Sequence, residues 1–251
     1  MRADWDYTSL AAAYLKRPDY AWEPIRKMLD AAGLKEGAEV CDIGAGAGHL
    51  TRPLAGNKFH IVAVEPNEAM RKNGIAQTAS FSNVTWHEGT AENTGQPASF
   101  FNLVVFGSSF NVTNRAEALR ETARILKPGG WFACLWNHRD LTDPLQAAIE
   151  NEIKTLIRGY DYGSRREDQA PVIQSSGLFD EVRYLEGKTW HEQKVSDCLE
   201  AWRSHATLSR QAGERIGAVL SEIERVILSA GKDPLLIPYV TRIWFARLGG
   251  R

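Results

Sequence analysis

Short apolar segments alternate with segments of helical periodicity through the first half of the chain. Five apolar segments rich in β-branched residues are predicted to be strands: 39–43, 60–64, 83–87, 102–106 and 131–136. Between them, apolar residues recur at helical spacing, which predicts helices near 49–55, 67–77 and 116–126. The last of these is expected to end at the turn Lys127–Gly130. This alternation is typical of βαβ units and a parallel sheet.

The second half has longer helical segments and fewer strands. One helix is predicted over 144–157, another ends near Gly177, and two more lie within 195–230. A polar loop is predicted over 158–169, and strands are predicted near 181–184 and 239–247. Two late strands joined by a long helical insertion are typical of an antiparallel edge on a parallel sheet. We therefore predict an α/β fold with a seven-stranded, mostly parallel sheet, helices on both faces and a helical cap.

The predicted parts form one domain, 1–251. N-terminal cap helices occupy 1–34, a core occupies 35–137, and helical cap insertions occupy 138–180 and 195–230. The cap is expected over the carboxyl edge of the sheet, where open α/β sheets bind ligands.

Three glycines crowd the point where the first strand passes into a helix. Gly44, Gly46 and Gly48 lack the Cβ atoms that would keep a backbone from bending tightly and approaching a ligand. Glu65, seventeen residues after Gly48, ends the second strand, where a carboxylate can accept both hydroxyls of a ribose. Together these features predict a cofactor that contains a nucleoside.

The residues around the glycines indicate which class of nucleoside-containing cofactor the turn would bind. Dinucleotide-binding turns usually have the spacing G-x-G-x-x-G, whereas His49 takes the place of the third glycine here. Asp42 precedes the turn, and its carboxylate would repel a pyrophosphate and suit a positively charged amino group. The turn therefore favours a nucleoside that carries an amino acid moiety.

In this order, the motifs resemble those of the class I S-adenosylmethionine-dependent methyltransferases, which have a Rossmann-like fold. The similar segments are Val40–Thr51, Val62–Met70, Gly89–Glu92, and Asn102–Gly107 with Leu126–Gly130. The segment Tyr14–Tyr20 is also similar to a small-molecule subgroup (methyltransferase type 11) that includes trans-aconitate methyltransferase. The resemblance implies S-adenosylmethionine as cofactor, S-adenosylhomocysteine as product and a cofactor-binding role for 35–137. The expected cofactor-binding residues are Tyr14, Arg17, Asp42, Gly44, Ala45, Gly46, Gly48, Glu65, Pro66, Met70, Thr90, Ala91, Glu92 and Gly107.

The acceptor is expected to be a small molecule, methylated on oxygen, nitrogen or carbon by direct displacement. Many relatives in the subgroup carry a His-Trp pair after the fourth strand, whereas this chain has Phe110-Asn111, and asparagine is no base at neutral pH. His138, expected just past the fifth strand, is our candidate general base. The expected acceptor contacts are Tyr7, Phe110, Asn111, Trp136 and His138.

Other aromatic and basic residues leave the acceptor pocket open to two interpretations. Tyr160, Tyr162 and Trp202 favour an apolar or aromatic pocket, while Arg165-Arg166 either meets a carboxylate or phosphate or lies in solvent. Tyr7, Tyr14 and Tyr20 either pack the N-terminal helix on the core or face the cofactor.

Two other functions compete with methyl transfer. A nicotinamide-dependent oxidoreductase would use the Tyr184-x-x-x-Lys188 spacing, but that pair works on a helix, and the segment is predicted to be strand and turn around Gly187. A non-catalytic, cofactor-binding methyltransferase-like protein is the other alternative, because a histidine is missing at Asn111.

The amino-acid composition indicates which binding partners and which cellular location to expect. The 251 residues include 30 basic and 31 acidic side chains, a net charge of −1, and no basic run, which disfavours nucleic acid. Cys41, Cys134 and Cys198 are far apart and predict buried free thiols, and the histidines lack metal spacing. No segment approaches the roughly 20 apolar residues of a membrane span. We expect a cytoplasmic monomer or homodimer that binds no membrane and no metal.

Overall fold

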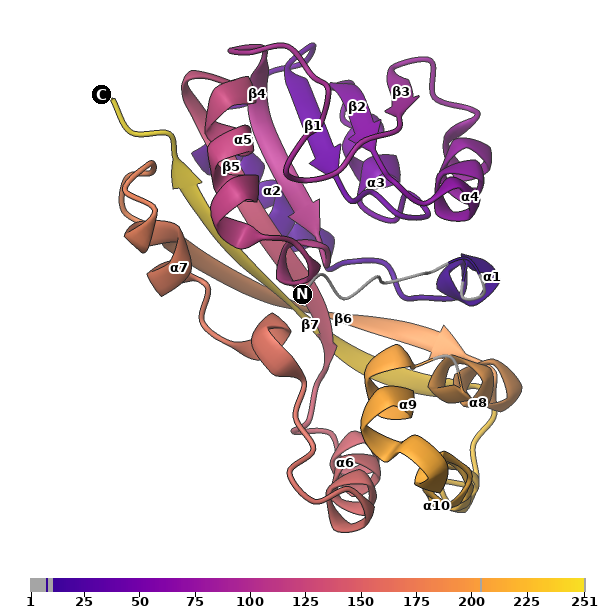
Figure 1. Ribbon diagram of the computed structural model, residues 1–251. Helices are drawn as coiled ribbons and strands as arrows, with labels where there is room; N and C mark the ends of the chain where they lie inside the picture. The colour runs from indigo at the N-terminus through magenta and orange to yellow at the C-terminus, as the bar shows by residue number, and fades with distance from the viewer. Residues whose placement is uncertain (1–7, 9–10, 204, 251) are drawn as a thin grey trace.

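A mixed β-sheet forms the centre of the molecule (Figure 1). The computed structural model describes residue 8, residues 11–203 and residues 205–250, and these contain seven strands in the order β3-β2-β1-β4-β5-β7-β6. The strands are β1 (Glu39–Ile43), β2 (His60–Val64), β3 (Val84–His87), β4 (Phe101–Gly107), β5 (Leu126–Arg139), β6 (Arg183–Gln193) and β7 (Leu235–Arg247). β1 to β5 pair in parallel, and β7 runs antiparallel to both β5 and β6. The predicted α/β class and mostly parallel seven-stranded sheet are confirmed.

Helices cover both faces of the parallel strands. On one face, α2 (Trp22–Ala31) and α3 (Thr51–Ala55) bury apolar side chains against β1, β2 and β4, and α4 (Glu68–Thr78) lies beside α3. On the other face, α5 (Arg115–Ile125) and α7 (Ala170–Ser175) pack on β4, β5 and β7. The strands between these helices are buried on both sides, which explains their almost continuous apolar sequence.

A third buried cluster forms a cap beyond the ends of the parallel strands (Figure 1). It consists of α6 (Pro144–Leu156), α8 (Val195–Arg203), α9 (Ala206–Ala212) and α10 (Ile216–Ser229), packed around the first residues of β7. The short α1 (Ala11–Tyr14) contacts α4 of the core, and Lys16 just after it donates a hydrogen bond to Asp197 of α8 at 3.1 Å. The N-terminal segment therefore connects the core to the cap.

Several predicted boundaries differ from the structure. The segment Lys127–Gly130, predicted to be a turn, belongs to β5, and a register shift between Phe101 and Leu103 accommodates it. β6 continues to Gln193 instead of ending near Tyr184, and the cap helices after it number three among the described residues rather than two. Gly187 makes no turn. A Cβ at this position would lie 2.6 Å from Cδ of Pro24, so the glycine allows α2 to approach the strand.

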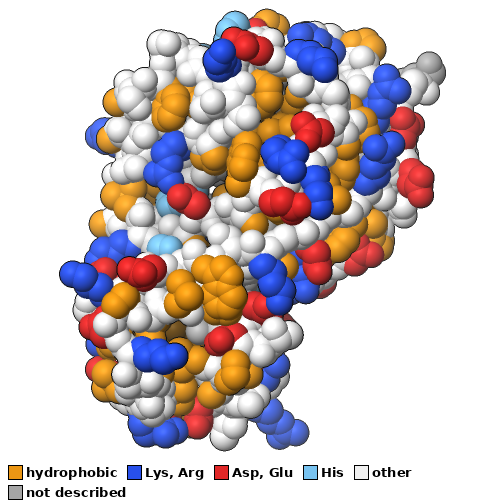
Figure 2. Space-filling model, turned by 180° about the vertical axis from the view of Figure 1, so that it is seen from behind, with side chains coloured by type: hydrophobic (Ala, Val, Ile, Leu, Met, Phe, Trp, Pro, Cys, Tyr) orange, Lys and Arg blue, Asp and Glu red, His pale blue; other side chains and the backbone are white. Residues whose placement is uncertain are grey.

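The visible surface carries mixed charge. Figure 2 shows acidic and basic side chains interspersed over this face, with no continuous basic area of the kind that binds phosphate backbones. Among the described helices, none combines the length and apolarity that crossing a bilayer requires.

Candidate functional site

A cavity of about 600 Å³ opens between the core and the cap. Residues that follow β1, β2 and β4 form one wall, and residues of η3 (Gly163–Arg166) and of the α8–α9 region form the opposite wall. The N-terminal segment from Tyr14 to Tyr20 also contributes to the lining. The cavity lies at the carboxyl ends of the parallel strands, where ligands of open α/β sheets bind.

Most residues predicted to bind the cofactor lie together in this cavity. Those that line it are Tyr14, Arg17, Gly44, Ala45, Gly46, Glu65, Pro66, Met70, Thr90, Ala91, Glu92 and Gly107. Asp42 and Gly48 do not line it. Twelve of the fourteen residues that the sequence predicted for cofactor binding therefore meet at this cavity.

The glycine turn needs its glycines for the backbone and for the space beside it. Gly44 has φ +66°, and a Cβ there would lie 2.5 Å from Cβ of Ser109, so no side chain fits. Gly46 has φ +57°, and its backbone N–H donates a hydrogen bond to Oε2 of Glu65 at 2.9 Å. The turn thus presents backbone, and no Cβ at these two positions, toward the cavity.

Glu65 links the ends of β1 and β2. Its Oε1 accepts a hydrogen bond from the backbone N–H of Asn67 at 2.9 Å, while its Oε2 is held by Gly46. Burial raises the pKa of this carboxyl, and these two backbone hydrogen bonds oppose the shift. Because a carboxylate oxygen has lone pairs for more than one donor, Glu65 retains capacity to accept hydrogen bonds from a ligand.

Asp42 does not face the cavity, contrary to our expectation. Its side chain is fully buried, and its Oδ2 accepts a hydrogen bond from Oγ1 of Thr51 at 2.7 Å at the start of α3. Burial raises the pKa of Asp42 to about 7, an effect that the Thr51 bond opposes. Asp42 lies on β1 beneath the turn, so the chain between Gly44 and Gly48 separates it from a ligand. Its contact with an amino group was predicted from sequence position alone.

Gly48 is needed for its backbone conformation, because its φ of +85° lies in the left-handed region that side chains rarely adopt. A Cβ there would meet Gly74 of α4 and Trp86 of β3 at 3.5 Å, an ordinary contact distance. Its effect on the cavity is therefore indirect.

The pKa of Asp42 leads to a prediction about stability and pH. The unfolded carboxyl ionises near pH 3.8 and the folded one near pH 7, so between these values the folded protein holds a proton that the unfolded chain has lost. The free energy of unfolding contributed by this group is therefore full below about pH 4 and falls as pH rises toward 7. We expect Asp42→Asn to gain stability relative to the natural chain over this range in urea denaturation series. A constant difference from pH 4 to 8 would contradict the assignment.

The residues predicted to contact the acceptor mostly lie elsewhere. Phe110 and Trp136 are buried in the core, and Trp136 donates a hydrogen bond through Nε1 to Oδ1 of Asn111 at 2.9 Å. None of these three lines the cavity. Tyr7 lies outside the described residues. Tyr160 and Trp202 belong to the cap core, whereas Tyr162 lines the cavity.

His138 lines the cavity but is unsuited to act as a base. It lies within β5, not past it, and is buried. Burial, followed by the charges of Arg166, Arg165 and Arg242, lowers the pKa of His138 to about 3. A general base is most effective when its pKa lies near the working pH, so this imidazole remains neutral and weakly basic.

We therefore expect His138→Gln to lower kcat less than about 10-fold, because general-base catalysis usually contributes about 10²- to 10⁴-fold. If His138 were the base, the pH profile of kcat would show an inflection between pH 5 and 8 in the natural chain that is missing in the variant. We expect the two profiles to have the same shape. A loss of 100-fold or more with unchanged cofactor affinity would restore His138 as the base.

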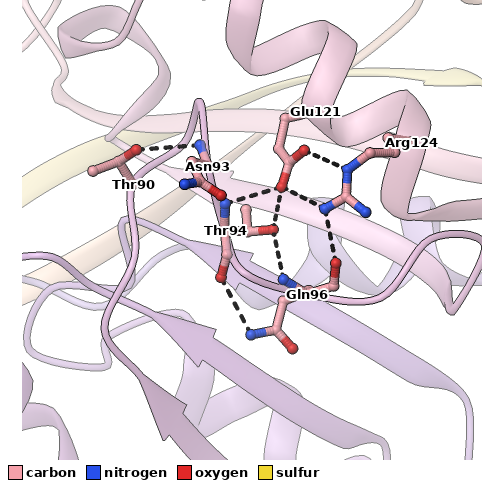
Figure 3. A network of polar contacts seen from close by, with 6 residues as sticks. All are labelled: Thr90, Asn93, Thr94, Gln96, Glu121 and Arg124. Carbon is pink, nitrogen blue, oxygen red and sulfur yellow. Dashed lines mark hydrogen bonds and ion pairs between the residues drawn. The ribbon is translucent and has the colours of Figure 1, made fainter.

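The loop that carries Thr90 to Glu92 is anchored by a polar network (Figure 3). Glu121 of α5 accepts hydrogen bonds from the backbone N–H and Oγ1 of Thr94, and Arg124 binds both oxygens of Glu121. Arg124 also donates to the backbone carbonyl of Gln96 at 2.7 Å. Burial would raise the pKa of Glu121, but the Arg124 and Thr94 bonds outweigh it and hold the pKa below its ordinary value. Helix α5 thus fixes the loop beside the cavity.

Sequence reasoning missed much of the remaining lining. These residues are Lys16, Pro18, Ile43, Ala47, His49, Asn67, Ser108, Ser109, Val112, Thr113, Asn137, Arg139, Gln193, Ala201, His205 and Tyr239. Ser108 has φ +59°, which is unusual for a residue with a side chain, and its Oγ lies 2.9 Å from the hydroxyl of Tyr20. No local pattern distinguishes these residues, because they come from separate elements that meet only in the folded chain.

Comparisons with known proteins agree with this geometry. Residues 41–134 match a family model described as a methyltransferase domain. A ubiquinone/menaquinone biosynthesis C-methyltransferase from Photorhabdus laumondii is 32% identical over 132 residues, which cover 50% of this chain and 53% of that protein. The chain thus spans about half the length of the curated relatives it matches. The family model, matched over residues 41–134, leaves the cap outside it.

Solved structures are similar over nearly the whole chain. One from Anaeromyxobacter dehalogenans, described as a putative type II methyltransferase, has a TM-score of 0.65 at 19% identity and covers 92% of this chain and 97% of its own. Another, a Haemonchus contortus phosphoethanolamine N-methyltransferase in complex with S-adenosyl-L-methionine, has a TM-score of 0.55 at 14% identity and covers 99% of this chain and 59% of its own. At these identities the similarity establishes the fold.

Proposed function

Because residues 41–134 match a methyltransferase domain and the chain shares its fold with solved structures described as methyltransferases, we propose that it transfers the methyl group of S-adenosylmethionine to a small-molecule acceptor. The observation that carries the proposal is Glu65 beside a turn whose glycines leave no Cβ in the cavity. Glu65 would accept the ribose hydroxyls, Pro66, Met70 and the loop from Thr90 to Glu92 would surround the adenine, and the backbone at Gly44 and Gly46 would lie beside the methionine portion.

The cofactor supplies a methyl group on a sulfonium, which an acceptor atom takes by direct displacement while sulfur keeps the electron pair of the broken bond. The protein's part is to align the acceptor and to exclude water. The lining histidine His138 is too weak a base at pKa about 3. Burial also lowers the pKa of His49 and His205, the other histidines of the lining. The acceptor therefore brings its own reactive nucleophile, and any proton that it loses is shed once the methylated product has left the cavity.

The oxidoreductase alternative finds no support in the site. Tyr184 and Lys188 lie on the edge strand β6, and neither lines the cavity. Lys188 donates a hydrogen bond to Asp140 at 2.7 Å. The pair thus lacks both the helix and the cavity position that a nicotinamide-dependent dehydrogenase would need.

Calorimetric titration with S-adenosylmethionine, S-adenosylhomocysteine and NADH tests the cofactor. We expect binding of the first two and none of NADH; binding of NADH alone would refute the proposal. Labelled methyl transfer into the small-molecule fraction of a cell extract then tests catalysis. Cofactor binding without transfer would favour a non-catalytic, cofactor-binding protein. We propose a cytoplasmic location and a monomeric or homodimeric state, which fractionation and sedimentation would test.

A further inference from the structure

Basic side chains outnumber acidic ones in the lining of the cavity. Among the described residues that line the cavity, the acidic ones are Glu65 and Glu92, both on the wall assigned to the cofactor. The basic lining residues are Lys16, Arg17, Arg139, Arg165 and Arg166. Arg165 and Arg166 belong to η3, Arg139 to β5, and Lys16 and Arg17 to the N-terminal segment, so positive charge gathers in the cavity although the whole chain is nearly neutral.

Arg165 and Arg166 are held in place by their own loop. Gln169, whose side chain is fully buried, donates hydrogen bonds through Nε2 to the carbonyls of Ser164 and Glu167 at 2.7 and 2.8 Å. The guanidinium carbons of Arg166 and Arg165 lie 3.8 and 5.0 Å from the ring centroid of Tyr162. Tyr162 in turn donates a hydrogen bond through its hydroxyl to Glu150 of the cap core. Two guanidinium groups thus share one anchored aromatic ring.

Among the described residues, this pair has no carboxylate in direct contact. Neither Arg165 nor Arg166 forms an ion pair within the described residues, and Nε of each is buried without a hydrogen bond. Glu150 pairs instead with Lys154 at 3.1 Å. Burial is the main cause that lowers the pKa of both arginines; Arg17 and Arg166 add to the effect at Arg165, and Arg242 adds to it at Arg166, where the charge of Glu150 opposes it. Two positive charges are thus removed from water without a direct ion pair, which is costly unless a ligand supplies one.

Lys16 differs from these arginines. Its ammonium pairs with Asp197 at 3.1 Å and also with Glu200, at the surface between α1 and α8. Its charge is therefore already balanced within the protein. Arg17 and Arg139 also line the cavity without an ion pair among the described residues, and they stack singly on Tyr14 and Trp202. Arg165 and Arg166 differ from them because they are adjacent and share one ring.

We propose that Arg165 and Arg166 bind an oxyanion of the methyl acceptor, a carboxylate or a phosphate monoester. A guanidinium stacked on an aromatic ring keeps its N–H edge free for two parallel hydrogen bonds to such a group. His138, neutral beside them, adds a hydrogen-bonding group without adding charge. The inference rests on the proposed function, since it names the class of acceptor for the same cavity.

The test uses the full chain saturated with S-adenosylhomocysteine. Calorimetric titrations compare small carboxylic acids with their primary amides, and phosphate monoesters with the parent alcohols. We expect at least one charged series to bind and its uncharged counterparts to bind at least 10-fold more weakly. The series that binds distinguishes carboxylate from phosphate. Absence of binding by every charged compound at millimolar concentration counts against the proposal.

Variants then assign the effect to the two arginines. Arg165→Gln with Arg166→Gln should weaken binding of the charged series about 10- to 100-fold, the loss expected when charge-assisted hydrogen bonds are removed. Arg120→Gln, an exposed change of the same charge on α5, should leave binding unchanged. Lysine at both positions should restore part of the affinity, because it keeps the charge but loses the planar geometry.

The cofactor itself carries a carboxylate, and the same variants exclude it as the occupant. We expect the double glutamine variant to bind S-adenosylhomocysteine with unchanged affinity. If instead it loses cofactor affinity as strongly as acceptor affinity, the arginines hold the cofactor and the inference is overturned. If the unaltered chain binds no S-adenosylhomocysteine, the failure belongs to the proposed function.

Discussion

Glu65→Ala is expected to weaken binding of S-adenosylmethionine about 10- to 150-fold. A hydrogen bond to a charged group contributes roughly 1.5–3 kcal/mol, and the change removes the carboxylate that we assign to the ribose. It also removes the acceptor of the Gly46 and Asn67 backbone N–H groups, at 2.9 Å each, so the turn would lose its link to β2. Calorimetry of the purified variant measures the effect directly, and an unchanged dissociation constant would refute the assignment.

Two further variants separate ligand binding from loss of structure. Glu65→Gln keeps the size of the side chain and one acceptor oxygen, so we expect an intermediate affinity. Glu36→Ala removes an exposed carboxylate that pairs with Lys58 outside the cavity, and it should leave cofactor affinity unchanged. Urea denaturation of each variant shows whether a weaker binder is also a less stable protein.

Phe110→Ala is expected to lower the free energy of unfolding by about 3–5 kcal/mol, the usual cost of truncating a buried aromatic residue. The Phe110 side chain is fully buried, and its ring centroid lies 5.4 and 5.5 Å from those of Phe106 and Phe132. Removing it leaves a void bounded by these rings that the sheet cannot close. Phe100→Ala, at a side chain that is 39% exposed, should cost less than about 1 kcal/mol.

A second substitution at Phe110 distinguishes a role in core packing from the predicted contact with the acceptor. Phe110→Leu keeps much of the buried volume, so it should leave cofactor affinity and acceptor KM unchanged while lowering stability only moderately. A change in KM without a change in stability would place Phe110 at the acceptor and contradict the packing described above.

The sequence determined the parts of this protein that depend on neighbouring residues. Apolar runs and helical periodicity predicted β1 and β2 at their observed bounds and α4 to within a residue. The glycine turn and Glu65 were predicted for a related reason. Both stand at ends of adjacent parallel strands, and the carboxyl ends of such strands meet at one edge of a sheet.

Only the tertiary structure decided which side chains face the cavity. Asp42, Phe110 and Trp136 are close in sequence to lining residues, yet the packing of helices on the two sheet faces directs them into the interior. Residues close to a site along a strand alternate between its faces, so proximity in sequence does not determine contact.

The acceptor wall depended most on long-range packing. Arg165 and Arg166 lie in a polar loop whose composition is equally compatible with solvent exposure, and they enter the cavity because Tyr162 and Gln169 anchor that loop to the cap. The cap itself exists because β5, β6 and β7 extend beyond the parallel strands and bury a third cluster. Local pattern thus determined the fold and most of the wall that we assign to the cofactor, whereas contacts between distant segments determined the charge and shape of the wall that we assign to the acceptor.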